Sequence, residues 1–206
     1  MKAIVELANA LSEKGYAVAE EVIDAKICNL FLHYLKEKHA EDELKKAGIG
    51  AGGDFQKNKA IRGDFIHWLT ADEENLQFKA WFSWIDSFSA YLNQQLFVGV
   101  RDREFHLAFY PPKTFYKKHL DQFKGRSNRL LSCILYLNEG WQEGDGGELK
   151  IYFENNEHLL IAPRLGTFVC FRSELFEHEV LPTNSARYSL TGWLLNYPKG
   201  IGFLGY

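Results

Sequence analysis

Hydrophobic positions follow two different rhythms along the chain, and the change comes near residue 100. Before it, apolar residues recur at helical spacing over residues 4–14, 24–46 and 72–97, which is typical of amphipathic helices. A short alternating segment, residues 16–20, lies between the first two and predicts a strand. The first half of the chain is therefore predicted to be mainly helical.

From residue 104 onward, short apolar segments are separated by turn residues such as Gly, Asp and Pro. About eight short strands with few helices between them are typical of a double-sheet jelly roll. We therefore expect an α+β, mainly β fold, in which residues 1–100 supply helical support and residues 104–196 form a double-stranded β-helix (jelly roll). The strands are predicted at residues 104–111, 115–121, 129–138, 147–153, 158–163, 166–172, 178–182 and 187–196.

A glycine-rich segment, residues 47–60 (AGIGAGGDFQKNKA), separates the second helical pattern from a strand-like one. Gly48, Gly50 and Gly53 fit G-x-G-x-x-G, but that motif indicates dinucleotide binding only when a strand precedes it and a helix follows. Here the predicted order is the reverse. We interpret the segment as a mobile loop, because loops with several glycine hinges often act as lids.

Composition narrows the class of protein further. With 206 residues, 46% hydrophobic, and no linker or internal repeat, the chain is expected to form a single domain over residues 1–206. A net charge of −3 lacks the basic excess of a nucleic-acid binder. No apolar segment approaches the ~20 residues that span a bilayer, and the N-terminus lacks a signal-peptide core. Three widely spaced cysteines without a C-x-x-C pair indicate free thiols in a reducing compartment, so we expect a cytoplasmic protein.

A candidate metal site begins at His119 and Asp121. In a strand, positions i and i+2 point to the same face, so the imidazole and the carboxylate are expected side by side. Two such ligands form two thirds of the facial triad that binds non-haem iron, and the third would be a distant histidine. His178, at the start of a predicted strand in FEHEVLP, is the best candidate. Each feature alone is commonly structural, so the interpretation depends on their order along the chain.

An anion site is predicted nine positions beyond His178, at Arg187. By strand alternation Arg187, Ser189, Thr191 and Trp193 share one face. A buried guanidinium must be paired or liganded, and its planar fork binds both oxygens of a carboxylate. The sequence therefore predicts an anionic co-substrate that reaches from the metal to Arg187.

The remaining histidines are predicted to differ in role. His106 shares a strand face with Tyr110, so we expect it to face the same cavity. His33 and His39 lie among charged residues on a helix and are expected at the surface. His158 follows a polar segment and is expected at a turn.

This pattern resembles the iron(II)- and 2-oxoglutarate-dependent dioxygenases. More narrowly, it is similar to the prolyl 4-hydroxylases of the oxygen-sensing type and their bacterial relatives. The similarity extends from about residue 45 to residue 196. It is carried by AIRGDFIHWL (60–69), FYPPKTFYKKHLD (109–121), RLLSCILYLNEGW (129–141), GGELKIY (146–152) and HEVLPTNSARYSLTGWLLN (178–196).

The resemblance assigns roles to the two predicted sites. It implies that His119, Asp121 and His178 hold iron(II), and that Arg187 binds the far carboxylate of 2-oxoglutarate. Tyr136, in ILYLN, would hydrogen-bond the same carboxylate.

The resemblance also predicts the walls of the pocket. Thr191 would lie close to the co-substrate carboxylate, Tyr110 would contact the co-substrate or the incoming proline, and Trp193 would wall the pocket. From its strand face, not from the resemblance, His106 is expected in the same pocket.

Arg62 and Asp64 follow the glycine-rich segment, where the family carries its substrate loop. We expect Asp64 to pair with Arg129. The alternative is that Arg62 and Asp64 form only a solvated charge pair.

The activity implied is hydroxylation of a prolyl residue in a protein substrate, coupled to decarboxylation of 2-oxoglutarate to succinate and CO2, with O2 consumed and ascorbate as reductant. Arg187 departs from the Lys of the collagen-type enzymes and favours the oxygen-sensing branch. A segment between Tyr110 and His119 that is one residue shorter than in the animal sensors indicates a compact bacterial form, expected to be a monomer. Bacterial relatives suggest a translation factor, elongation factor Tu foremost, as substrate.

Two alternatives stay open. An oxygenase of the same superfamily could act on a small molecule or on nucleic acid, although the acidic balance disfavours nucleic acid. A jelly-roll binding module with a vestigial metal site is the other, and the intact ligand set counts against it.

Overall fold

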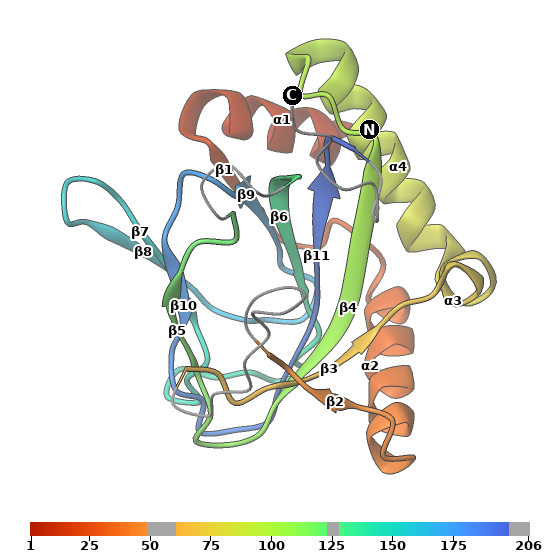
Figure 1. Cartoon of the computed structure of the whole chain (residues 1–206), viewed down its shortest axis with the longest axis vertical. Coiled ribbons are helices and arrows are strands. Elements are labelled where there is room, and N and C mark those ends of the chain that lie inside the picture. The colour runs from red at the N-terminus through yellow and green to blue at the C-terminus, as the bar shows by residue number, and fades with distance from the viewer. Residues whose placement is uncertain (49–60, 123–127, 198–206) are drawn as a thin grey trace, which may run out of the picture.

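The computed structural model describes residues 1–48, 61–122 and 128–197. The glycine-rich segment beyond residue 48 and the tail from residue 198 lie outside these residues, so the predicted lid is not tested. The described chain forms two sheets (Figure 1), one with strand order β1-β9-β6-β11-β4-β3-β2 and one with order β5-β10-β7-β8. All neighbouring strands are antiparallel. The predicted mainly β class is confirmed.

The helices are α1 (Lys2–Lys14), α2 (Ala25–Ala40), α3 (Ala71–Leu76) and α4 (Lys79–Leu96). The strands are β1 (Tyr16–Ala19), β2 (Lys45–Lys46), β3 (Phe65–Trp68), β4 (Asp102–Tyr110), β5 (Tyr116–His119), β6 (Arg129–Tyr136), β7 (Leu149–Tyr152), β8 (His158–Ile161), β9 (Phe168–Arg172), β10 (His178–Val180) and β11 (Arg187–Leu195).

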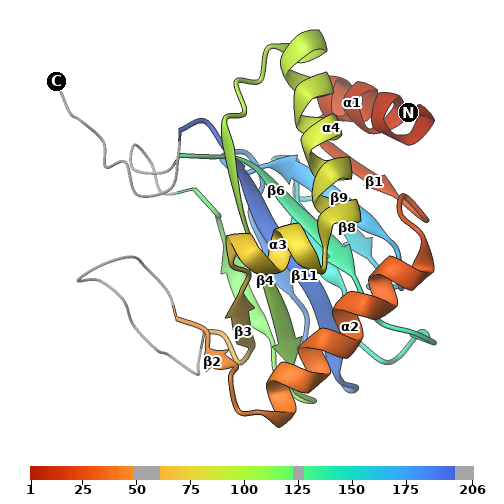
Figure 2. The same cartoon turned by 90° about the vertical axis from the view of Figure 1, so that its right-hand side faces the viewer.

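The helices cover one face of the seven-stranded sheet (Figure 2). The buried stripe of α4 in this layer is largely aromatic. Trp81 and Phe88 of α4 meet the ring of Phe168 on β9 edge-on, with centroids 5.8 and 6.1 Å apart. Each such side chain contributes about 1.5–3 kcal/mol by leaving water. The helices of this layer thus pack against one face of the large sheet and leave its other face to the small sheet.

The helix predicted over residues 24–46 is shorter than expected. α2 begins after its N-cap Asp24, whose side chain accepts from the Lys26 backbone N–H, and it ends at Ala40. Asp42 adopts a positive φ of 58°, a conformation that ends a helix. The chain then pairs as β2 with β3, so a strand, not a helix, precedes the glycine-rich segment.

The single helix predicted over residues 72–97 is two helices. Thr70-x-x-Glu73 in the sequence has the pattern of a capping box, and in the structure this capping box is present and opens α3. The break comes at Phe78, which is 1% exposed and stacks on Phe31 of α2 with centroids 4.1 Å apart. Burying this ring turns the chain before α4 begins, and helical periodicity alone could not reveal that turn.

The space between the two sheets holds a second apolar cluster, to which Ile134 and Phe171 contribute from the large sheet and Leu149 and Ile151 from the small one. From β4 to β11 the chain passes repeatedly between the sheets, and we interpret this as the expected jelly-roll topology. The cysteines are buried and free, as predicted. Within the described ranges, no helix has the length and apolar character to cross a membrane.

Candidate active site

His119, Asp121 and His178 come together between the sheets. One ligand atom from each lies within 4.8 Å of the others. His119 Nε2 is 3.5 Å from Asp121 Oδ1, and His178 Nε2 is 3.6 Å from Asp121 Oδ2. Two histidines and one carboxylate, with open positions opposite them, are the ligand set of non-haem iron(II). The predicted cluster is therefore present, and it can hold a metal ion.

Strand pairing explains why the two imidazoles meet. His119 ends β5, His178 begins β10, and the two residues are direct partners in the antiparallel register. Directly opposed side chains on one face lie close together, and the two rings are 4.3 Å apart. Asp121 reaches the site differently from the prediction, because β5 stops at His119 and Asp121 lies in the bend beyond it.

Both imidazoles are oriented by a backbone carbonyl two residues earlier. His119 Nδ1 lies 2.7 Å from the Lys117 carbonyl oxygen, and His178 Nδ1 lies 3.0 Å from that of Phe176. A carbonyl only accepts, so each Nδ1 donates its hydrogen. Nε2 of the neutral ring then presents its lone pair to the centre, which is the arrangement found in metal-ligating histidines.

The charge states suit a cation. Burial lowers the pKa of His178 to about 4, with His119 adding to the effect and Asp121 opposing it. Burial raises the pKa of Asp121, but His178, His119 and Arg129 lower it by more, so this pKa lies well below its usual range. At neutral pH the site therefore offers an ionised carboxylate and a neutral imidazole.

A cavity of about 500 Å3 opens beside these residues. It is lined by the metal-ligand cluster and by most of the other predicted site residues, namely Arg62, His106, Tyr110, Arg129, Arg187, Thr191 and Trp193. Tyr136 and Asp64 are fully buried next to it. The predicted set is thus brought together around one space.

Arg187 lines this cavity and is 3% exposed. Its Nε donates to the Gly147 carbonyl at 2.8 Å and its Nη1 to Ser189 Oγ at 3.4 Å. The Tyr136 ring is 5.1 Å from the guanidinium carbon, and among the described residues the buried Tyr136 hydroxyl has no hydrogen-bond partner. A buried positive charge beside an unsatisfied hydroxyl fits the carboxylate of a ligand.

Gly147 is a site residue that sequence reasoning missed. A Cβ there would lie 2.8 Å from Arg187 Cδ, and the backbone has a φ of +75°. Only glycine allows both the conformation and the close approach. The sequence signal for Gly147 was the Asp145-Gly146-Gly147 segment, but from sequence alone this segment looks like any turn between two strands.

Trp68, His106 and Trp193 form an aromatic wall that lines the same cavity as the metal-ligand cluster. His106 lies between Trp68 and Trp193, with ring centroids 4.7 and 5.6 Å away. The Arg129 guanidinium carbon lies 3.4 Å from the Trp193 centroid. His106 lines the cavity, where the strand alternation predicted it, and so does Trp68, which sequence reasoning missed within the alternating IHWL segment.

The expected Asp64–Arg129 pair is wrong. Asp64 accepts instead from Arg62, with Nε to Oδ1 at 2.7 Å, and Arg129 pairs with Glu104 at 3.0 Å. Glu104 stands opposite Trp193 in the register, so Arg129 reaches it by lying over the indole. The solvated alternative for Arg62 is also wrong, because Asp64 is 0% exposed.

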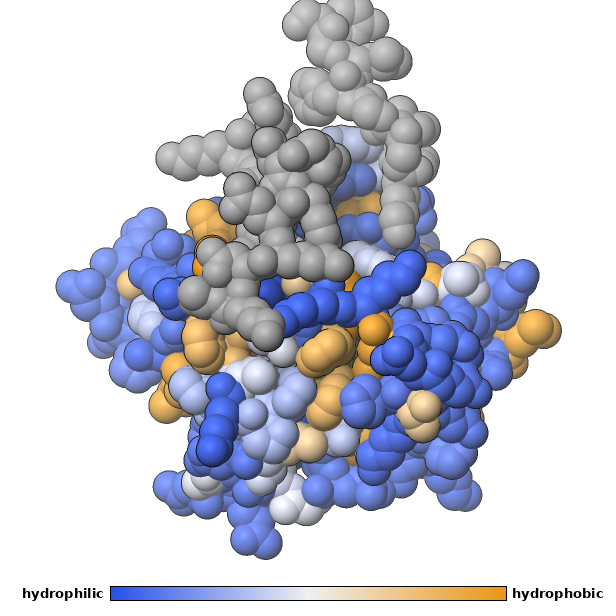
Figure 3. Space-filling model, turned by 60° about the horizontal axis from the view of Figure 1, so that its bottom comes forward, coloured by the Kyte–Doolittle hydropathy of each residue, from blue (hydrophilic) through white to orange (hydrophobic). Residues whose placement is uncertain are grey.

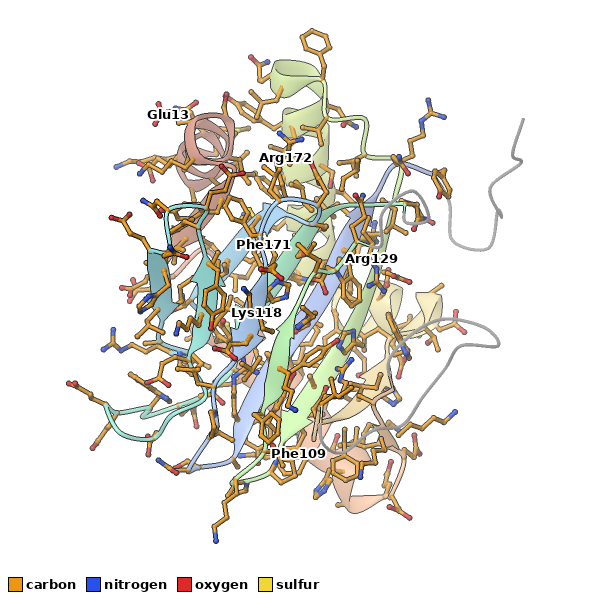
Figure 4. The ribbon with its side chains drawn as sticks, turned by 60° about the vertical axis from the view of Figure 1, so that its left-hand side comes forward. Glu13, Phe109, Lys118, Arg129, Phe171 and Arg172 are labelled. Carbon is orange, nitrogen blue, oxygen red and sulfur yellow. The ribbon has the colours of Figure 1, made fainter. Side chains whose placement is uncertain are left out.

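Figure 4 shows the site region from the side, with Phe171 on β9, Arg129 on β6 and Lys118 on β5 labelled. The Phe171 ring is fully buried, and its centroid lies 4.8 Å from that of the His178 ring. Lys118 is half-exposed and pairs with Glu177 at 2.6 Å, outside the cavity. From below (Figure 3), the molecule is mainly hydrophilic, with hydrophobic side chains gathered near the middle of the view.

Comparison with known proteins agrees with this geometry. The family model of the 2OG-Fe(II) oxygenase superfamily matches residues 105–195. The crystal structure of a Pseudomonas putida prolyl-4-hydroxylase has a TM-score of 0.85 and 32% identity, covering 94% of this chain and 99% of that one. Prolyl hydroxylase EGLN3 of Homo sapiens is 27% identical over 191 residues, which are 89% of this chain and 79% of the relative.

A prolyl hydroxylase from Trichoplax adhaerens, solved in complex with a hypoxia inducible factor oxygen degradation domain peptide fragment, has a TM-score of 0.85 at 24% identity, covering 95% of this chain and 90% of that one. Identity this low concerns the fold alone. The Pseudomonas putida alignment spans nearly the whole of both chains at 32% identity, and it carries the assignment. The chain therefore belongs to the 2OG-Fe(II) oxygenase superfamily, as an iron(II)- and 2-oxoglutarate-dependent prolyl 4-hydroxylase-like dioxygenase.

Proposed function

We propose that this enzyme hydroxylates a prolyl residue in a protein substrate, using O2 and decarboxylating 2-oxoglutarate to succinate and CO2. The observation that carries the proposal is the presence of two sites at one cavity. The metal-ligand cluster and the buried Arg187 both line it, and Arg187 lies beside Tyr136, whose buried hydroxyl is unsatisfied among the described residues. A dicarboxylate that chelates a metal at one end and needs a cation at the other fits these two sites.

In this proposal His119, Asp121 and His178 hold iron(II). When bound, the iron supplies dioxygen activation and the oxidising power for the C–H bond. Arg187 and the Tyr136 hydroxyl bind the far carboxylate of 2-oxoglutarate.

Thr191 and Tyr110 line the same cavity as the two sites. Their share is to orient the co-substrate. Together with the surrounding wall they keep water away from the reacting atoms.

The substrate side is proposed to be the aromatic wall. Trp68 is 38% exposed at the cavity, and His106 and Trp193 are buried behind it. Flat aromatic faces suit the ring of a proline, because they offer apolar contact area. Arg62, held by Asp64, lies at the same cavity and is proposed to contact the substrate backbone.

We propose a translation factor such as elongation factor Tu as the protein substrate, on the resemblance to bacterial prolyl hydroxylases. We also propose that the chain works as one domain and as a cytoplasmic monomer with ascorbate as reductant. The buried free thiols of Cys28, Cys133 and Cys170 support a reducing compartment.

The test is succinate formation by the purified protein with iron(II), ascorbate, 2-oxoglutarate and purified elongation factor Tu. We expect succinate to form in a metal-dependent way, and one proline of the substrate to gain the mass of one oxygen atom. Asp121→Ala is the control and is expected to abolish both signals. Metal-dependent succinate with a small molecule but with no protein would indicate the small-molecule alternative. No succinate with any partner would overturn the proposal.

A further inference from the structure

Asp121 differs from the two histidines in how its backbone is held. His119 and His178 are opposed in the ladder between β5 and β10, so strand pairing fixes both. Asp121 lies beyond the end of β5, in a bend. Its carboxylate therefore needs other contacts to keep its orientation.

Two buried serines provide such contacts. Ser132 Oγ lies 2.7 Å from Asp121 Oδ2, and Ser173 Oγ lies 2.9 Å from Ser132 Oγ. The serines are 1% and 0% exposed. An ionised carboxylate only accepts hydrogen bonds, so Ser132 donates to Asp121. The Ser132 oxygen then accepts from the Ser173 hydroxyl. Hydrogen bonds are therefore donated in one direction, from Ser173 to Ser132 and from Ser132 to Asp121.

Ser132 stands on a rigid part of the large sheet. On β6 it is the register partner of Trp193 on one side and of Phe171 on the other. Ser173 follows β9 directly, and its backbone N–H donates to the Leu130 carbonyl at 3.1 Å. The two hydroxyls are therefore fixed in position before any ligand binds, and a charged acceptor strengthens such bonds.

We infer that Ser132 and Ser173 are positioning residues, which fix the Asp121 carboxylate for metal binding and tie it to the large sheet. This inference rests on the proposed iron site. The histidine ligands belong to the small sheet, whereas Arg187 belongs to the large one. The Ser132–Asp121 bond thus connects the metal position to the sheet that binds the co-substrate.

Metal affinity tests the inference without turnover. Titration calorimetry with Mn(II) is expected to give a Kd about 10–100-fold higher for Ser132→Ala than for the wild type, the range typical for lost ligand-orienting bonds. Ser173→Ala is expected to raise the Kd by less. Ser132→Thr keeps a hydroxyl and is expected to restore wild-type binding. Electron paramagnetic resonance of bound Mn(II) is expected to change in Ser132→Ala but not in Ser132→Thr.

Cys133→Ala is the matched control, because Cys133 is the next residue on β6, is equally buried, and faces the helices. It is expected to leave the Kd unchanged. Wild-type Mn(II) affinity in Ser132→Ala, or an equal loss in Cys133→Ala, would overturn the inference alone. Absence of Mn(II) binding in the wild type would overturn the proposed iron site as well. If Ser132→Ala does not fold, Ser173→Ala decides the question. Unchanged Mn(II) affinity in Ser173→Ala would then contradict a positioning role for the hydrogen bonds from Ser173 to Ser132 to Asp121.

Discussion

At the scale of single residues, the contacts of Arg187 are with neutral groups, and its positive charge has no carboxylate partner among the described residues. It donates to a carbonyl and a hydroxyl, while the described residues place no carboxylate within ion-pair distance of it. Burying a charge in this way is unfavourable unless a ligand completes the pairing. The residue is thus better explained by binding than by stability.

We predict that Arg187→Ala raises the 2-oxoglutarate Kd by roughly 10–100-fold, the equivalent of losing a hydrogen bond to a charged group. Metal affinity is expected to change much less. Calorimetric titrations of each ligand would separate the two effects. An equal loss of both affinities would count against a carboxylate clamp.

Gly147 gives a sharper test of the same clamp. In Gly147→Ala the new Cβ would press on Arg187 Cδ, 2.8 Å away, so the 2-oxoglutarate requirement is expected to rise. Gly140→Ala is the control, because Gly140 also has a positive φ, of +67°, but nothing lies within 4 Å of its Cβ. Both variants are expected to lose about 1–2 kcal/mol of unfolding free energy, and only the first to lose co-substrate affinity. Equal co-substrate affinity in the two variants would contradict this account.

Sequence reasoning was strongest where chemistry restricts residue type. Histidine, carboxylate and arginine in one order predicted a metal-ligand cluster and an anion site, and the geometry brings them together. Sequence reasoning was weakest in predicting which charged residues form ion pairs with each other. Asp64 and Arg129 each had several possible partners, and only the register of β4 with β11 puts Glu104 beside Trp193 and within reach of Arg129.

At the scale of elements, Glu73 ties three of them together. It closes the capping box of α3 with Thr70, contacts His67 of β3 at 2.8 Å, and accepts from the Tyr34 hydroxyl of α2. Burial raises the pKa of Glu73, but the hydrogen bonds from Tyr34, Thr70 and His67 lower it to about 2. A carboxyl group with a lowered pKa stabilises the fold only in its ionised form.

The sign of the pH dependence follows from that shift. Stabilisation by Glu73 is complete above the ordinary value of 4.5 and is lost as pH falls from there toward about 2. Glu73→Gln is therefore expected to be less stable than the wild type at neutral pH, with the difference shrinking below pH 4.5. Urea unfolding at several pH values would measure it. A difference that does not change with pH would contradict an ionic contribution.

Element boundaries could be predicted only where a local signal marks them. The Thr70–Glu73 capping box was visible in the sequence and is present. The end of α2 depends on a positive φ at Asp42, and the break before α4 depends on burial of Phe78 against Phe31. The first is a local backbone conformation at an exposed residue and the second is tertiary packing, and helical periodicity reveals neither of them.

At the scale of the whole molecule, the division of labour between the two sheets explains the position of the site. The large sheet is backed by helices (Figure 2) and carries Arg187, Tyr136 and Trp193. The small sheet carries the two histidines. The mainly β class could be predicted from the strand pattern. Which strands form each sheet, and how the two sheets face each other, could not, because local sequence does not encode strand order.

The short ladder between β5 and β10 has a consequence for folding. These strands are four and three residues long, so their hydrogen bonds alone specify their alignment weakly. A shift by one residue would turn His119 to the opposite face, since side chains alternate. A bound metal ion would therefore be compatible with one alignment only. Metal binding would stabilise the chain with the correct strand register and would not stabilise a chain with a shifted register.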